Sequence, residues 1–161
     1  MSWLTGYELE NLVYNNADDK TQKAFLGIFA IDGLPQQIPH LPALLIINTH
    51  TSNLAGEHWK AVYISQEHCG EVFDSLAQPT STRLLQWMNC FTRKWIRSSL
   101  TIQNPLSGTC GAFVLYFILT RLHARNFASC LQLFSNDLYK NDLLMTDFVM
   151  KLKKMKVASS P

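Results

Sequence analysis

The sequence has few charged residues, no long apolar run and no leader-like start. Charged residues make up 16% of the 161 residues and hydrophobic residues 47%, a balance that excludes an intrinsically disordered chain. No apolar run reaches the roughly 18 to 20 residues of a membrane span, and the first residues lack the basic-then-apolar order of a secretory signal. We therefore expect an intracellular protein with no membrane partner, folded as one domain over residues 1–161.

Cysteine is also sparse and irregularly spaced. The sequence contains four cysteines, namely Cys69, Cys90, Cys110 and Cys130. They form no CxxC pair, so the pattern indicates neither a disulfide framework nor a zinc site. We expect reduced thiols and no bound metal.

Charge of either sign is weakly clustered. The net charge is +2, and the fourteen Lys and Arg residues gather only near the C-terminus, at Lys151, Lys153, Lys154 and Lys156. Such a segment is most often a solvated helix end, and a nucleic-acid contact is the alternative.

Hydrophobic patterning predicts helices and strands that follow one another irregularly. A Thr5–Glu8 capping box begins the first helix, which should end near Asn16. Further helices are expected over residues 81–94, 110–125 and 127–134, and from a cap at Asn141. Strands are expected over residues 25–30, 44–47, 58–64, 71–74 and 96–102. The helix that begins at Cys110 is apolar nearly all round, so we expect an α+β fold in which a mixed, mostly antiparallel sheet packs against this buried central helix.

One stretch, from Gln103 to Gly111, carries the features of a nucleophile site. It delivers Cys110 to the start of the apolar helix, where unpaired backbone N–H groups and the positive dipole end favour a thiolate. Gly108 and Gly111 allow a substrate to approach the backbone closely. The amide of Gln103 is placed to donate to a developing oxyanion.

A cysteine nucleophile needs a base, and His58 is the best candidate. It opens the 58–64 strand, and a hairpin turn near residues 66–70 would place it across from Asp74 within about two residues of register. Asp74 could then bind the ring nitrogen that faces away from the thiol. The neighbouring Trp59 is expected to be a core residue.

These residues resemble a known family. The segments Gly56-Glu57-His58-Trp59 and Val72-Phe73-Asp74-Ser75-Leu76, and Gln103 seven positions before Cys110-Gly111, resemble the adenovirus-type cysteine endopeptidase (adenain) family, with its relatives in Maverick/Polinton elements and related viruses. Phe73-Asp74-Ser75-Leu76 is also similar to the SUMO-specific proteases of the same superfamily. The resemblance covers roughly residues 4–120. The chain departs from adenain in having Asp74 where a glutamate is usual, and in its shorter length.

The resemblance implies a papain-like core with the catalytic order His, Asp, Cys. It implies His58 as base, Asp74 as orienting acid and Cys110 as nucleophile, with Gln103 and the Cys110 amide forming the oxyanion hole. The implied substrate-binding residues are Trp59, Gly56, Gly108 and Gly111. No cofactor is needed for the chemistry, but the family adds an activating peptide and DNA, and a location in the host nucleus or virion.

The function predicted from these features is that of a cysteine endopeptidase. It would cut after small, glycine-containing motifs, mature the structural precursors of a virus or transposon, and act as a monomer. A deconjugating protease for a ubiquitin-like modifier is the first alternative, and an acyltransferase with the same Cys and His is another. An inactive, DNA-associated binding module is the alternative from a different class.

Overall fold

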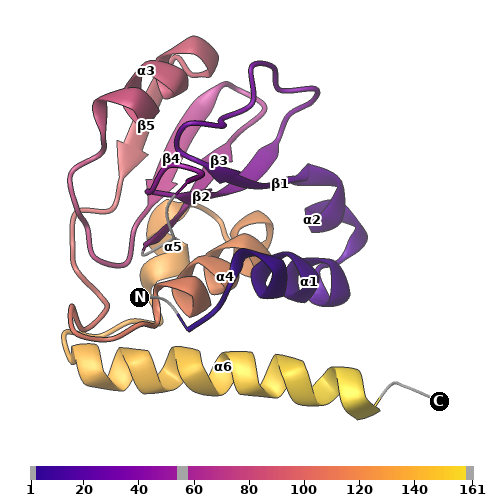
Figure 1. Cartoon of the computed structure of the whole chain (residues 1–161), viewed down its shortest axis with the longest axis vertical. Coiled ribbons are helices and arrows are strands. Elements are labelled where there is room, and N and C mark those ends of the chain that lie inside the picture. The colour runs from indigo at the N-terminus through magenta and orange to yellow at the C-terminus, as the bar shows by residue number, and fades with distance from the viewer. Residues whose placement is uncertain (1–2, 54–57, 159–161) are drawn as a thin grey trace.

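A mixed five-stranded sheet forms the centre of the computed structural model, which describes residues 3–53 and 58–158 (Figure 1). Its strands lie in chain order: β1 (Phe25–Ala30), β2 (Ala43–Asn48), β3 (Trp59–Ile64), β4 (Cys69–Phe73) and β5 (Lys94–Arg97). The β1–β2 and β4–β5 pairs are parallel, and the two pairs between them are antiparallel. The described sheet is therefore evenly mixed, where the sequence predicted a mostly antiparallel one.

The N-terminal segment is built as predicted, with one addition. Helix α1 (Gly6–Asn16) begins with the complete Thr5–Glu8 capping box. A second helix, α2 (Asp19–Ala24), was not predicted. Asp18 caps it by accepting a hydrogen bond from the Thr21 N–H. Aspartate is a preferred residue at this position, so Asp18 was the sequence signal for the start of α2.

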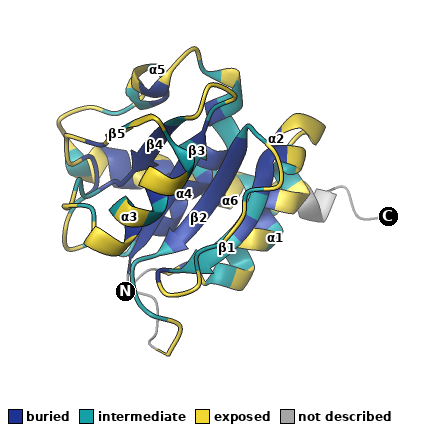
Figure 2. Cartoon of the chain, turned by 90° about the horizontal axis from the view of Figure 1, so that it is seen from above, coloured by how far each residue is buried: buried dark blue, intermediate teal, exposed yellow. Residues whose placement is uncertain are grey.

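Helices cover both faces of the sheet. On one face, α4 (Cys110–Thr120) packs against β2 and β3. Helix α1 and the long α6 (Leu138–Ala158) pack against α4, and α5 (Phe127–Leu131) contributes Phe127 and Cys130 to the same core. On the other face, Leu84 and Met88 of α3 (Thr82–Phe91) pack on the outward side chains of β2, β3 and β4. Figure 2 shows the result, with the central strands and α4 in the colour of buried residues. The predicted buried helix beginning at Cys110 is confirmed.

Several predicted boundaries differ from those in the structure. α3 ends at Phe91, because the Arg93 N–H donates to His68 O and the chain then joins the sheet as β5, earlier than the predicted 96–102 strand. α4 ends at Thr120 and continues as a short 3₁₀ turn, η1 (Arg121–His123).

The start of α6 also differs from the predicted one. α6 begins at Leu138, and the Lys140 N–H donates to the side chain of Asp137. Asn141, the predicted cap, lies inside the helix and binds Ile102 O and Ser135 O instead. No helix among the described residues is long and apolar enough to cross a bilayer.

Candidate active site

The β3–β4 hairpin sets the relative positions of His58 and Asp74. Ala61 pairs with Phe73, and extending this register by one residue places Lys60 opposite Asp74, with His58 two residues farther along. This is the offset that the sequence predicted. Thr49, at the end of β2, donates both its N–H and its hydroxyl to His58 O and so fixes the backbone there.

His58 and Asp74 form a short, buried pair. Nε2 of His58 lies 2.6 Å from Oδ1 of Asp74, and the two residues are 7% and 3% exposed. Burial lowers the pKa of His58, but the hydrogen bonds and charges of Asp74 and Cys110 outweigh it and raise the pKa from 6.5 to about 9. These contacts therefore favour the protonated form of the ring.

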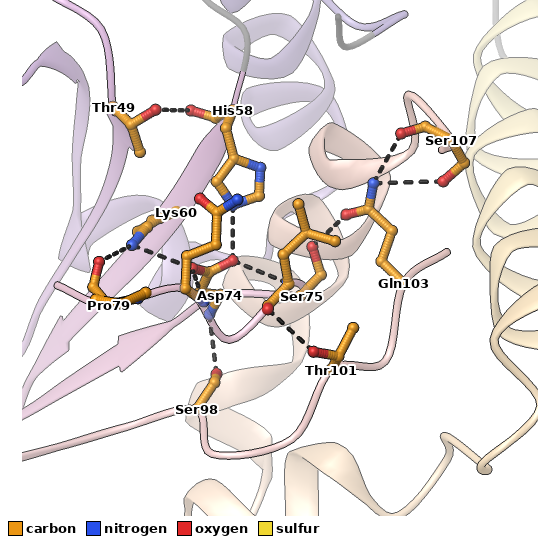
Figure 3. Close-up of polar contacts among 12 residues, drawn as sticks. Thr49, His58, Lys60, Asp74, Ser75, Pro79, Ser98, Thr101, Gln103 and Ser107 are labelled. Atoms are coloured by element: carbon orange, nitrogen blue, oxygen red, sulfur yellow. Dashed lines mark hydrogen bonds and ion pairs between the residues drawn. The ribbon is translucent and has the colours of Figure 1, made fainter. Parts of the chain in front are cut away.

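The carboxylate of Asp74 is held at both oxygens. Oδ1 also accepts from the Leu76 N–H at 2.9 Å, while Oδ2 accepts from the Gln78 N–H at 3.0 Å and lies 3.1 Å from Nζ of Lys60. Burial raises the pKa of Asp74, but the hydrogen bond and charge of His58, with the charge of Lys60, hold it below its ordinary value. Figure 3 shows His58 and Lys60 both directed at this carboxylate.

Cys110 is the first residue of α4, and its side chain is hydrogen-bonded to His58. Because Nε2 of His58 contacts Asp74, Nδ1 is the ring nitrogen that remains available to the thiol. Cys110 is 1% exposed. An imidazolium beside a thiol in the first turn of a helix favours the thiolate.

Gln103 lies in the loop that leads to Cys110 and is almost fully buried. Its Oε1 accepts a 2.6 Å hydrogen bond from the hydroxyl of Ser75, the residue after Asp74. Its Nε2 donates to Ser107 O at 3.0 Å and, more weakly, to Ser107 Oγ at 3.3 Å (Figure 3). The amide nitrogen is thus held against the loop just before the cysteine.

Helix α6 and the N-terminal segment anchor the same loop. Oδ1 of Asp142, in the first turns of α6, accepts from the Thr109 hydroxyl at 3.0 Å and from the Asn104 N–H at 3.3 Å. The Trp3 N–H donates to Gly108 O at 3.1 Å. The loop is therefore tied to two elements that are distant in sequence.

The predicted substrate-binding residues have different placements. Trp59 is 5% exposed, packs in the core, and donates its indole N–H to Leu4 O. Gly111 is buried in the first turn of α4, while Gly108 is half-buried in the loop. Gly56 lies outside the described residues.

The other candidate ligands and charges do not converge on the site. None of the four cysteines is in a disulfide. Among the described residues, no group of three or more His, Cys, Asp or Glu side chains could hold a metal ion. Of the C-terminal lysines, Lys151 pairs with Asp147 at 2.8 Å, and Lys153 lies 5.4 Å from the centre of the Trp3 ring.

Sequence reasoning missed Lys60, Ser75 and Asp142. Lys60 gave a signal, because a lysine stands out inside the apolar strand that follows His58. Ser75 and Asp142 gave none that spacing reveals, since each acts on a segment more than 25 residues away.

Comparison with known proteins finds likeness in structure and not in sequence. Neither a protein-family model nor a curated protein matches the chain. Two crystal structures of the ASFV pS273R protease, one with selenomethionine, superpose with TM-scores of 0.61 and 0.60 at 16% and 15% identity. They cover 89% of this chain, which spans 67% and 66% of theirs. The central domain of an uncharacterized Legionella pneumophila protein has a TM-score of 0.53 at 12% identity, covering 96% of this chain and 98% of that one.

At these identities the likeness establishes the fold. The predicted fold class is confirmed: the chain has an α+β, papain-like fold, similar to that of the ASFV pS273R protease. The described chain carries this fold with the cysteine at the start of its buried central helix.

Proposed function

We propose that the chain is a cysteine endopeptidase in which His58, Asp74, Gln103 and Cys110 carry out the reaction. The observation that supports this most directly is the position of the His58 ring, hydrogen-bonded to Asp74 through one nitrogen and to the Cys110 side chain on the other side. A buried histidine whose pKa is raised to about 9 between a carboxylate and a thiol at a helix start has the arrangement of an activated nucleophile.

In the proposed reaction the thiolate of Cys110 attacks the carbonyl carbon of the scissile peptide bond. The imidazolium of His58 then donates its Nδ1 proton to the leaving amine as the C–N bond breaks, which leaves a thioester on Cys110. Water attacks the thioester, His58 takes a proton from it, and the thiolate departs with the carboxylic acid product released. Asp74 fixes the ring and stabilises its charged form.

The oxyanion would be held by the Cys110 backbone N–H and Nε2 of Gln103. The 3.3 Å bond from Nε2 to Ser107 Oγ is the weaker of its two, and exchanging it for the oxyanion would leave the 3.0 Å bond to Ser107 O in place. Ser75 would keep the amide nitrogen directed at the loop during this exchange.

The sequence resemblance supplies the finer part of the proposal. It suggests a relative of adenain or of Maverick/Polinton proteases that matures viral or transposon precursors in the nucleus or virion, cuts after glycine-containing motifs, and is activated by a peptide and by DNA. The C-terminal lysines add little support for DNA, because Lys151 and Lys153 already contact other side chains. A panel of ubiquitin-like modifiers joined to a fluorophore would distinguish a deconjugating protease from this enzyme.

An internally quenched peptide library, incubated with and without DNA, tests the proposal. Wild type should hydrolyse a subset of peptides, and Cys110→Ala should lose the activity while keeping its unfolding transition. A thiol-labelling test is best made with Cys90→Ser as the background, since Cys90 is exposed and would otherwise react as well. Peptide hydrolysis that survives in Cys110→Ala would refute the assignment.

A further inference from the structure

Lys60 occupies an unusual position for a lysine. It lies in β3 between Trp59 and Ala61, is 4% exposed, and its ammonium group contacts Oδ2 of Asp74 at 3.1 Å and Pro79 O at 3.3 Å (Figure 3). A lysine is almost never buried this far unless it is paired. Its partner is the acid that also orients His58.

The charges of the site explain why a fourth group is useful. In the reactive state Cys110 is negative, His58 positive and Asp74 negative, so the three together carry one net negative charge in a buried place. Burying an uncompensated charge is costly. Lys60 continues the alternation at the far end of the row and brings the net charge of the four groups to zero.

Each oxygen of the Asp74 carboxylate has its own pair of donors. Oδ1 receives His58 and the Leu76 N–H, while Oδ2 receives Lys60 and the Gln78 N–H. With a donor pair on each oxygen the carboxylate is fixed against rotation about its terminal bond. Oδ1 therefore stays in line with the imidazole.

We propose that Lys60 is a positioning residue of the active site, which holds Oδ2 of Asp74 and balances the charge of the Cys110–His58–Asp74 row. The inference rests on the proposed function. Among the described residues, the charged or titratable side chains that interact with Asp74 are Lys60 of β3 and His58, which directly precedes β3, and Cys110 of α4 interacts with the imidazole.

Lys60→Met tests the proposal because it keeps an unbranched side chain, one atom shorter, and removes the charge. The lysine repels the imidazolium through the shared carboxylate, so its loss should raise the pKa of His58 by on the order of one unit. The measurement is an NMR titration of the His58 ring, with the resonance assigned by its absence in His58→Gln. The limb of the kcat/KM–pH profile that reports His58 should move in the same direction.

Two matched variants separate charge from packing. Lys60→Arg keeps the charge, and a cavity of about 110 Å³ beside Lys60, lined by Ile31, Ile47, Pro79 and Leu84, gives the larger guanidinium room. Lys94→Met removes an equal charge from an exposed position on β5. Both should titrate like wild type at His58.

The outcomes divide cleanly. A His58 pKa that rises in Lys60→Met and stays unchanged in the two controls supports the proposal, and an unchanged value in folded Lys60→Met overturns it. If Lys60→Met does not fold, the test uses the NMR resonance of the Lys60 ammonium group in the wild-type protein. A slowly exchanging resonance at neutral pH supports the contact with Asp74, and its absence overturns the proposal. Both NMR readouts work without turnover, so a lack of peptidase activity would refute the proposed function and leave this test standing.

Discussion

Replacing Asp74 with asparagine should separate a role of this carboxylate in stability from its role in activity. The buried carboxylate accepts from His58 and the Leu76 N–H on one oxygen, and from Lys60 and the Gln78 N–H on the other. Asparagine keeps the shape but offers one acceptor oxygen and no charge. In Asp74→Asn, Lys60 therefore loses its counter-ion, whereas His58 loses the carboxylate that orients its ring and stabilises its charged form.

The stability cost comes mainly from Lys60. Asp74→Asn leaves the buried ammonium without a counter-ion, which costs about 3–5 kcal/mol of unfolding free energy. Lys60→Met alone leaves Asp74 with three other donors and should cost about 1–2 kcal/mol. The double variant contains no unpaired charge, so it should be more stable than Asp74→Asn by about 1–3 kcal/mol.

The activity cost comes from His58 and should not recover. An amide in place of the carboxylate neither stabilises the imidazolium nor fixes the tautomer, so kcat/KM should fall by on the order of 10³- to 10⁴-fold in Asp74→Asn. Adding Lys60→Met restores no carboxylate. The double variant should therefore remain as slow as Asp74→Asn while regaining stability.

Urea denaturation followed by tryptophan fluorescence gives the unfolding free energies, and hydrolysis of a peptide selected from the quenched library gives kcat/KM. A double variant no more stable than Asp74→Asn would refute the reasoning, since the unpaired lysine would then not be the source of the loss. Activity that returned together with stability would refute the second half, because Asp74 would then act only by stabilising the fold.

Three further predictions follow from buried or crowded positions. Arg121→Met should lower the unfolding free energy by about 3–5 kcal/mol, because it leaves the carboxylate of Glu71 without the guanidinium that donates two 2.6 Å hydrogen bonds to it in wild type. Urea denaturation should show that adding Glu71→Met recovers most of this loss. Gly70→Ala should lower the unfolding free energy by about 1–3 kcal/mol, since its Cβ would lie 2.5 Å from a side-chain carbon of α3, whereas Gly33→Ala, with its nearest atom at 3.8 Å, should have little effect in the same assay. The folded-state pKa of His58, about 9, exceeds its ordinary 6.5, so the stability that its proton contributes is complete below pH 6.5 and is lost as pH rises through about 9. Over that range the unfolding free energy of wild type relative to His58→Gln should fall by up to about 3 kcal/mol. A difference that does not change with pH would contradict the raised pKa.

Local sequence signals predicted the parts of the fold that depend on neighbours in sequence. The Thr5–Glu8 capping box, the 25–30 strand and the start of the central helix at Cys110 are all confirmed, because caps and apolar runs act over a few residues. The hairpin offset between His58 and Asp74 was accessible for the same reason: a short turn fixes register.

Long-range contacts decided what local signals could not. β5 begins at Lys94 because β4 pairs with it in parallel there. The periodicity of residues 94–97 does not predict a strand. Trp59 is a core residue because the N-terminal segment covers it and accepts its indole N–H at Leu4 O, a contact between residues 55 positions apart. Asn141 resembled a helix cap in sequence, but its side chain joins loops from two other parts of the chain.

Ser75 shows how the separate parts of the site are brought into register. It follows Asp74 directly, it is fully buried, and its carbonyl oxygen accepts from the N–H groups of Ile102 and Gln103 while its hydroxyl donates to Oε1 of Gln103. The residue that follows Asp74 thus binds the loop that carries Gln103. Since Asp142 ties the other end of that loop to α6 through Thr109, the cysteine loop is held at both ends. The position of Cys110 relative to His58 is therefore set by polar contacts of the loop as well as by the packing of α4 against the sheet.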